Sequence, residues 1–73
     1  MHIEYDREAD ALYIQLQGKY VAKTKEVEEG VLIDFDENSR LIGVEILEVT
    51  KRFALSDIVN IHVENLPIEV AGK

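Results

Sequence analysis

The residues best suited to chemistry lie in one acidic stretch, and their spacing matches that of a calcium-binding loop. Asp34, Asp36 and Asn38 are separated by single residues, and Glu45 stands at position 12 counted from Asp34. Oxygen donors at positions 1, 3, 5 and 12 are ligands by which an EF-hand loop holds calcium. Position 6 of such a loop is a glycine that allows a sharp turn, whereas this chain has Ser39 there.

The residues on both sides of this stretch favour a hairpin over a metal loop. An EF-hand needs a helix on each side, but residues 31–36 and 41–49 alternate in the manner of strands. Asp, Asn and Ser are also common turn residues, because their short side chains bond to the nearby backbone. We therefore expect a β-hairpin and no cofactor. The alternative is a divalent-metal or small-ligand site at residues 34–45, with Asp34, Asp36, Asn38 and Glu45 as its ligands.

The acidic charge of the chain points to a basic partner. The chain has 15 acidic and 8 basic residues, and its net charge is −7. Such a charge repels the phosphate backbone of nucleic acids and attracts basic proteins. Two pairs of carboxylates, on residues 26/28 and 34/36, would share one sheet face if their strands were neighbours. The predicted contact residues for a basic partner are Glu26, Glu28, Asp34, Asp36 and Glu45.

The other residue types give little support to catalysis. The chain has no cysteine, which rules out disulfides, thiolate chemistry and Cys-ligated zinc. His2 and His62 are far apart in the sequence, and neither Ser39 nor Ser56 has a histidine nearby. A hydrolytic triad therefore has no local basis. We expect a protein that is not an enzyme.

Short alternating runs separated by turn residues must position these side chains, and this pattern is typical of a β-meander. Strands are expected around residues 3–5, 11–16, 21–28, 31–36 and 41–49, with turns at 6–10, 18–19, 29–30 and 37–40. Tyr13 and Leu32 fall on the side opposite the main apolar residues and could mark an interface. The expected fold is α+β and predominantly β, an antiparallel meander of five or six strands.

The last third of the chain predicts one short helical turn and a further strand. A helical turn is expected near residues 51–58, with Ser56 as the N-cap of a helix that begins at Asp57. Val59, Ile61 and Val63 then alternate with polar residues, which favours a sixth strand. After it, Pro67 interrupts an apolar tail, whose large residues are Leu66, Ile68 and Val70.

The length of 73 residues predicts one domain, residues 1–73, that needs a partner. A chain of this size buries only about 60% of its unfolded surface. A sheet with one apolar face needs a cover, either the tail or a second copy, and we expect a homodimer. The first residues lack a basic region followed by an apolar run, and no stretch approaches ~18 apolar residues. We therefore expect a cytoplasmic protein without membrane contact.

The segment Tyr5–Ile14, YDREADALYI, resembles the opening signature Y-D-x-E-x-D-A-L-Y-I of a small prokaryotic family, a domain of unknown function. Later parts of that family's pattern are similar to residues 26–30 and 31–36, and its G-I-E-I-L run is similar to GVEIL at residues 43–47. The resemblance covers about residues 1–53. Ser39 stands where the family's hairpin usually has glycine, and Val49-Thr50 replaces an Ala-Ser pair.

This resemblance implies a binding role rather than an activity. Some members of the family look like the antitoxin half of two-gene modules, beside a small basic toxin-like protein. The acidic charge of the present chain agrees with such a partner. The resulting expectation is a small acidic protein-binding module that neutralises a basic partner, with an apolar edge or the tail adding strand pairing.

Overall fold

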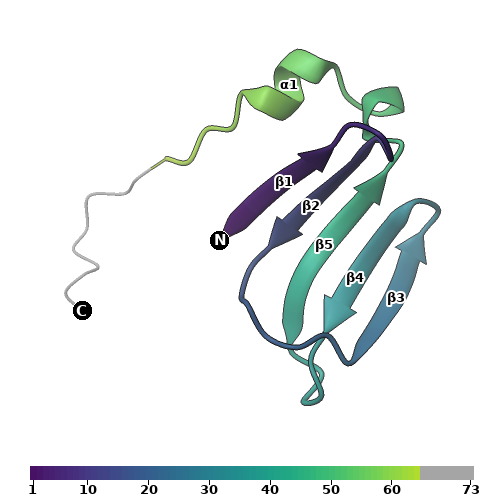
Figure 1. Cartoon of the computed structure of the whole chain (residues 1–73), viewed down its shortest axis with the longest axis vertical. Helices are drawn as coiled ribbons and strands as arrows, with labels where there is room; N and C mark the ends of the chain where they lie inside the picture. Colours follow the sequence, from purple (N-terminus) through teal and green to yellow (C-terminus); the bar gives the residue numbers. More distant parts are fainter. Residues whose placement is uncertain (65–73) are drawn as a thin grey trace.

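The computed structural model describes residues 1–64. Its five strands are β1 (His2–Asp6), β2 (Ala11–Gln15), β3 (Lys23–Glu28), β4 (Val31–Phe35) and β5 (Leu41–Leu47). A 3₁₀ turn, η1 (Val49–Lys51), and a short helix, α1 (Leu55–Val59), follow the last strand (Figure 1). The prediction of a predominantly β, α+β fold with an antiparallel sheet and a short helical turn is confirmed.

All neighbouring strands run antiparallel, in the order β1-β2-β5-β4-β3. β1 and β2 form a hairpin, while β3, β4 and β5 form a meander whose last strand lies beside β2. Residues 16–22 carry the chain from β2 to the far edge of the sheet (Figure 1). The N–H groups of Leu16 and Ala22 hold the ends of this crossing, by donating to the carbonyls of Ile42 and Phe35 at 2.7 and 2.8 Å.

The strand register divides the side chains between two faces, because residues paired across antiparallel strands point to the same side. Two rows of apolar or aromatic residues share one side. They are Ile3, Ile14, Val44 and Ile33 in the first row and Tyr5, Leu12, Ile46 and Val31 in the second. We call this side the apolar face. Tyr13 and Leu32 lie on the other side, as their alternation predicts.

The apolar face is only partly covered within residues 1–64. A groove of about 300 Å³ separates β1, β2 and β5 from α1, with Ile58 and Phe53 on the helical side. The hydrophobic residues that are buried in the described chain are Ala11, Ile42, Val49 and Ile58. All five residues of β4 are only half-buried. The hydrophobic core is therefore small relative to the 47% of hydrophobic residues in the chain.

The predicted sixth strand is wrong for residues 59–63. Val59 ends α1, where the N–H of Asn60 donates to the carbonyl of Ser56 at 3.1 Å. Residues 60–64 have no regular secondary structure and pair with none of the five strands. An alternating sequence forms a strand only where a strand edge is available to pair with it.

The predicted cap of the helix is also wrong, because Ser56 lies inside α1. The N-cap residue is Ala54, which makes no side-chain hydrogen bond, and α1 begins at Leu55 instead of Asp57. Pro67 and the apolar tail residues Leu66, Ile68 and Val70 lie outside the described residues. Within the described part, neither helix is long and apolar enough to cross a membrane.

The turn between β4 and β5 holds a serine in a backbone conformation that favours glycine. Ser39 has φ of 62°, and its N–H donates to the carbonyl of Asp36 at 3.0 Å. The left-handed conformation places the Cβ of an ordinary residue close to the following carbonyl oxygen, which costs about 1 kcal/mol or more. This explains why a glycine suits this position of the hairpin.

Ser39→Gly is therefore expected to stabilise the chain. The relief of the left-handed conformation exceeds the added backbone entropy of glycine, so the free energy of unfolding should rise by about 0.5 kcal/mol. Urea unfolding measures this change. Ser56→Gly, in the helical conformation of α1, is the matched control and should lower the same quantity by about 0.5 kcal/mol. Equal effects of the two substitutions would contradict this explanation of Ser39.

Candidate functional site

Acidic side chains lie on the face opposite the apolar one, in a row that crosses all five strands. Successive cross-strand pairs connect Glu4 on β1, Tyr13 on β2, Glu45 on β5, Leu32 on β4 and Glu26 on β3. We call these five residues the acidic row. Its outer carboxylates, Glu4 and Glu26, are exposed, and its three inner residues are half-buried. Since α1 packs beside the apolar face, it leaves this row accessible.

Asp34 lies next to the acidic row, and side chains of two other strands hold it in place. The hydroxyl of Tyr13 donates to Oδ2 of Asp34 at 3.1 Å, and that of Thr24 donates to Oδ1 at 2.6 Å. Tyr13 reaches Asp34 across Gly43, where an added Cβ would lie 2.5 Å from the Tyr13 hydroxyl oxygen. Gly43 thus leaves the space that the Tyr13 side chain occupies.

The environment of Tyr13 keeps its hydroxyl protonated. Burial raises the pKa of Tyr13 above its ordinary value, and the hydrogen bond to Asp34 and the charges of Asp34 and Glu45 raise it further. Because the hydroxyl donates its proton to Asp34, Tyr13 has no role here as a base. The arrangement fixes an aromatic side chain between two carboxylates of the row, which suits recognition better than proton transfer.

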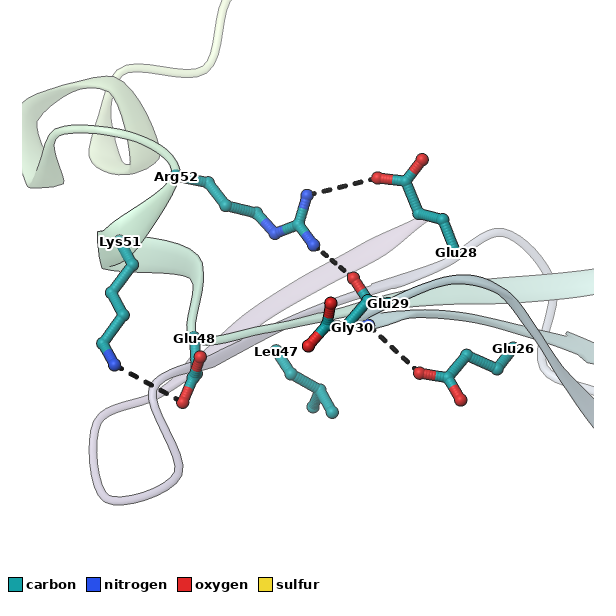
Figure 2. Close-up of a pocket in the computed structure, with 8 residues that line it drawn as sticks. All are labelled: Glu26, Glu28, Glu29, Gly30, Leu47, Glu48, Lys51 and Arg52. Carbon is teal, nitrogen blue, oxygen red and sulfur yellow. Dashed lines mark hydrogen bonds and ion pairs between the residues drawn. The ribbon is translucent and has the colours of Figure 1, made fainter.

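Glu28 does not belong to this row. The register between β3 and β4 shifts between Glu26 and Glu28, which separates the two side chains. Figure 2 shows Glu28 facing Arg52, with Nη1 of Arg52 lying 3.3 Å from Oε2 of Glu28. Arg52 also donates to the carbonyl of Glu29, while Glu26 accepts from the N–H of Gly30 at 3.1 Å. Glu28 therefore helps to hold the segment after β5 against the β3–β4 turn.

Asp36 has a structural environment in the β4–β5 turn. It is 7% exposed, and its Oδ1 accepts from the N–H groups of Asn38 at 2.8 Å and Arg40 at 2.9 Å. The Arg40 N–H is the main reason that the pKa of Asp36 lies below its ordinary value, with the Asn38 N–H adding to the effect. Both bonds close the predicted hairpin turn and require no metal ion.

The residues proposed above as ligands of a divalent metal ion do not form a cluster in the described part of the chain. Asp34 and Glu45 share the acidic side of the sheet, whereas Asp36 is enclosed by the turn. Among residues 1–64, no three His, Cys, Asp or Glu side chains are grouped closely enough to hold a metal ion. The segments on both sides of the stretch are β4 and β5, as the hairpin interpretation predicts.

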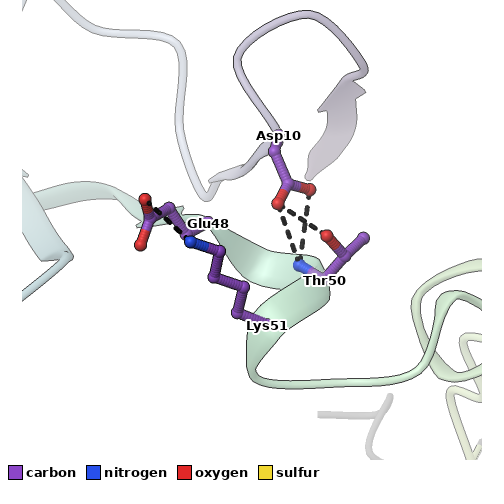
Figure 3. A network of polar contacts seen from close by, with 4 residues as sticks. All are labelled: Asp10, Glu48, Thr50 and Lys51. Carbon is purple, nitrogen blue, oxygen red and sulfur yellow. Dashed lines mark hydrogen bonds and ion pairs between the residues drawn. The ribbon is translucent and has the colours of Figure 1, made fainter.

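A second polar cluster joins the β1–β2 turn to η1. It gives Tyr5 and Asp10, the first and last residues of the YDREAD segment, a structural role. Asp10 accepts from the hydroxyl of Thr50 at 2.6 Å and from that of Tyr5 at 2.8 Å. Its carboxylate also accepts from the Thr50 N–H, as Figure 3 shows, beside the ion pair of Lys51 with Glu48. The Thr50 hydroxyl is the main reason that the pKa of Asp10 lies below its ordinary value. The cluster therefore stabilises the fold, and no substrate is needed to explain it.

The predicted contact residues fall into two groups in the structure. Glu26, Asp34 and Glu45 lie together on the acidic side of the sheet. Glu28 instead pairs with Arg52, and Asp36 accepts hydrogen bonds within the β4–β5 turn. Sequence reasoning missed Glu4, although its position between Ile3 and Tyr5 indicates that it faces away from the apolar side. Its place beside Tyr13 follows only from the hairpin register.

Comparisons with known proteins agree with the resemblance of the sequence to a domain of unknown function. Residues 2–49 match the family described as protein of unknown function (DUF2283). The chain is also similar to uncharacterized protein MJ0789 of Methanocaldococcus jannaschii, with 43% identity over 51 residues. That alignment covers 70% of this chain and 43% of the relative, so the chain spans less than half of the relative's length. No solved structure matches the chain significantly.

The family match contains the whole sheet, and with it the acidic row, Asp34 and Gly43. It covers 48 of the 73 residues, from residue 2 to residue 49. The chain therefore belongs to the DUF2283 family of proteins of unknown function.

Proposed function

We propose that this chain is a non-enzymatic protein-binding module whose acidic row binds a small basic protein. The observation that carries the proposal is the placement of three carboxylates across the sheet, with Tyr13 and Leu32 between them. Carboxylates attract a basic partner and orient it, while aromatic and aliphatic side chains supply contact area. The family resemblance suggests one form of this function, the neutralisation of a toxin by an antitoxin-like partner.

The spacing of the acidic row suits a basic helix that lies across the strands. Neighbouring strands are separated by about 4.8 Å, so carboxylates two strands apart are separated by about 10 Å. Seven residues of an α-helix rise about 10.5 Å. A partner helix with a lysine or arginine every seven residues would therefore meet Glu4, Glu45 and Glu26 in turn. Its apolar residues on the same side would contact Tyr13 and Leu32.

The negative charge of the chain favours a basic protein over a nucleic acid as the partner of the acidic row. The row contains no basic residue, and the whole chain has a net charge of −7. A phosphate backbone would be repelled from such a surface, whereas the side chains of a basic protein would exchange water for carboxylate contacts. The half-buried Tyr13 hydroxyl is already bonded to Asp34, which fixes the ring that the partner would contact.

Charge reversal in the acidic row is expected to abolish capture of the partner. The tagged chain should retain a stoichiometric small basic protein from cells of its native host, and release it at high salt. Glu4→Lys with Glu45→Lys should reduce this capture about tenfold or more, because two attractive contacts become repulsive. Quantitative mass spectrometry of the captured proteins measures the change.

The matched control is Glu8→Lys with Glu37→Lys. Glu8 and Glu37 are exposed turn residues away from the acidic row, and their replacement changes the net charge by the same amount. Both double variants have a charge of −3, since each substitution adds two positive charges to −7. Full capture by the control and loss by the row variant would support the proposal. Equal loss in both variants, or no stoichiometric basic partner at all, would refute it.

A further inference from the structure

Part of the apolar face is left uncovered by residues 1–64 of a single chain. α1 and the residues beside it face Ile3, Leu12 and Ile46 of β1, β2 and β5 across the groove. Towards the opposite edge of the same face, β4 contributes Val31, Ile33 and Phe35, and these remain half-buried. Cross-strand pairing places Val44 beside Ile33 on the same face. We call Val31, Ile33, Phe35 and Val44 the open half of the apolar face.

Helix α1 has a matching surplus of apolar side chains. Ile58 is buried against its own sheet, but Leu55 and Val59 on the same short helix are 55% and 70% exposed. Phe53 and Ile61, before and after the helix in the sequence, are about half exposed, although both line the groove that faces their own sheet. A helix with apolar residues on more than one side is typical of an element that is buried on more than one side. The outer side of α1 therefore lacks a packing partner within the described chain.

The charges beside these two surfaces are complementary. The open half borders Lys25 and Lys23 of β3, which pair with Ile33 and Phe35 and share their face. Glu28 pairs with Val31 at the same edge, and its ion pair with Arg52 balances its charge. The Lys23 ammonium lies 5.8 Å from the centre of the Phe35 ring, which agrees with this placement. Helix α1 carries a single charged residue, Asp57, which is exposed and borders the groove between α1 and its own sheet. The two apolar surfaces can thus meet without bringing like charges together.

We propose that the apolar face binds a second copy of this chain, so that α1 of each subunit packs on the open half of the other. The arrangement is a homodimer with two-fold symmetry, in which each subunit supplies both a helix and an open sheet surface. It covers the exposed residues of α1 and the half-buried residues of β4 at the same time. The acidic rows then lie on the outer sides of the dimer, where both can bind a basic partner.

The charge distribution favours a second copy over other occupants of this face. Two chains with a net charge of −7 repel each other, unless the surfaces that meet lack acidic side chains. The two apolar rows contain none from β1 to β4, and the open half borders two lysines together with Glu28, whose charge is balanced by Arg52. An acidic helix from an identical chain fits this surface. The tail of the same chain is the competing occupant, and it would leave the protein monomeric.

Sedimentation velocity of the full chain tests the proposal. The wild type is expected at twice the 8.3 kDa of one chain, over a range of micromolar concentrations. Val59→Lys should raise the dimer dissociation constant about tenfold or more, since it places a cation against Lys23 and Lys25 of the other subunit. Tyr20→Lys is the control, because Tyr20 is 87% exposed in the β2–β3 connection. This control should leave the dimer intact.

A second variant on the sheet side keeps the test informative if Val59→Lys impairs folding. Lys25→Glu lies on exposed β3 and should also weaken the dimer at low salt, because it faces the acidic α1 of the other subunit. Circular dichroism checks that each variant retains its β-sheet spectrum. A monomeric wild type would overturn the proposal. A dimer that withstands both Val59→Lys and Lys25→Glu would overturn it as well, by assigning the contact to another surface.

Discussion

Gly43→Ala is expected to cause one of the largest losses of stability in this chain. An added Cβ would lie 2.5 Å from the Tyr13 hydroxyl oxygen and 2.8 Å from the carbonyl oxygen of Ile14. Tyr13 can move only by losing its hydrogen bond to Asp34, and the Ile14 carbonyl is part of the β2 backbone. Overpacking of this kind costs about 1–3 kcal/mol. Urea unfolding should show this decrease in the free energy of unfolding.

Gly18→Ala is the matched control for this prediction. An added Cβ at Gly18 would have no heavy atom within 4 Å, so the same substitution should change stability only slightly. The variant Gly43→Ala with Tyr13→Ala separates the two contacts, because it removes the ring and leaves the backbone contact with Ile14. Equal stability of the Gly43→Ala and Gly18→Ala variants would contradict the claim that Gly43 leaves the space through which Tyr13 reaches Asp34.

Asp10→Asn is the second substitution with a large expected effect on stability. Asp10 accepts hydrogen bonds from Tyr5 and from the hydroxyl and N–H of Thr50, which join the β1–β2 turn to η1. Asparagine removes the negative charge and still tolerates the left-handed backbone of residue 10, whose φ is 53°. The melting temperature at neutral pH should therefore fall, and the cause would be the lost charge-assisted bonds rather than backbone strain.

The pH dependence of this difference identifies its cause. The folded state holds the pKa of Asp10 below its ordinary value, so the charged carboxylate stabilises the fold above the unfolded pKa. This contribution is lost as the pH falls from about 4 through the lower folded value. The difference in melting temperature between wild type and Asp10→Asn should thus be largest at neutral pH and decrease in acid. Glu8→Gln, in the same turn, is the control and should show no comparable trend.

A difference between wild type and Asp10→Asn that stays constant from neutral to acid pH would refute this explanation. Asp36, whose pKa is also lowered, remains in both proteins and contributes to the acid sensitivity of each. Comparing the two proteins therefore isolates Asp10.

Much of the fold could be predicted from local sequence, because alternation and turn residues act within single strands and hairpins. Gly30 takes φ of 82° in the predicted turn, and the predicted sides of Tyr13 and Leu32 are confirmed. The strand order was less accessible, since the pairing of β2 with β5 joins residues more than 25 positions apart. Residues 59–63 alternate as a strand does, but no strand edge pairs with them in the described part of the chain.

The candidate site depended more strongly on register than on residue type. The spacing of Glu26 and Glu28 predicts a shared face, but a shift in register between them directs Glu28 towards Arg52. The turn at residues 36–40 similarly encloses Asp36, which sequence spacing cannot distinguish from the exposed carboxylates. Glu4 joins the acidic row only through its pairing with Tyr13. Alternation assigns a face, whereas pairing between strands decides which side chains meet.

The most direct test of the acidic row is a methyl NMR spectrum of the chain with and without its captured basic partner. Leu32 and Ile33 are neighbours on β4 and face opposite sides of the sheet, so each serves as the control for the other. Binding at the acidic row should shift the Leu32 methyl signals and the Tyr13 ring signals, and leave the Ile33 methyl signals unchanged. Shifts of Ile33 and Ile14 with an unchanged Leu32 would place the partner on the apolar face and contradict the proposed function.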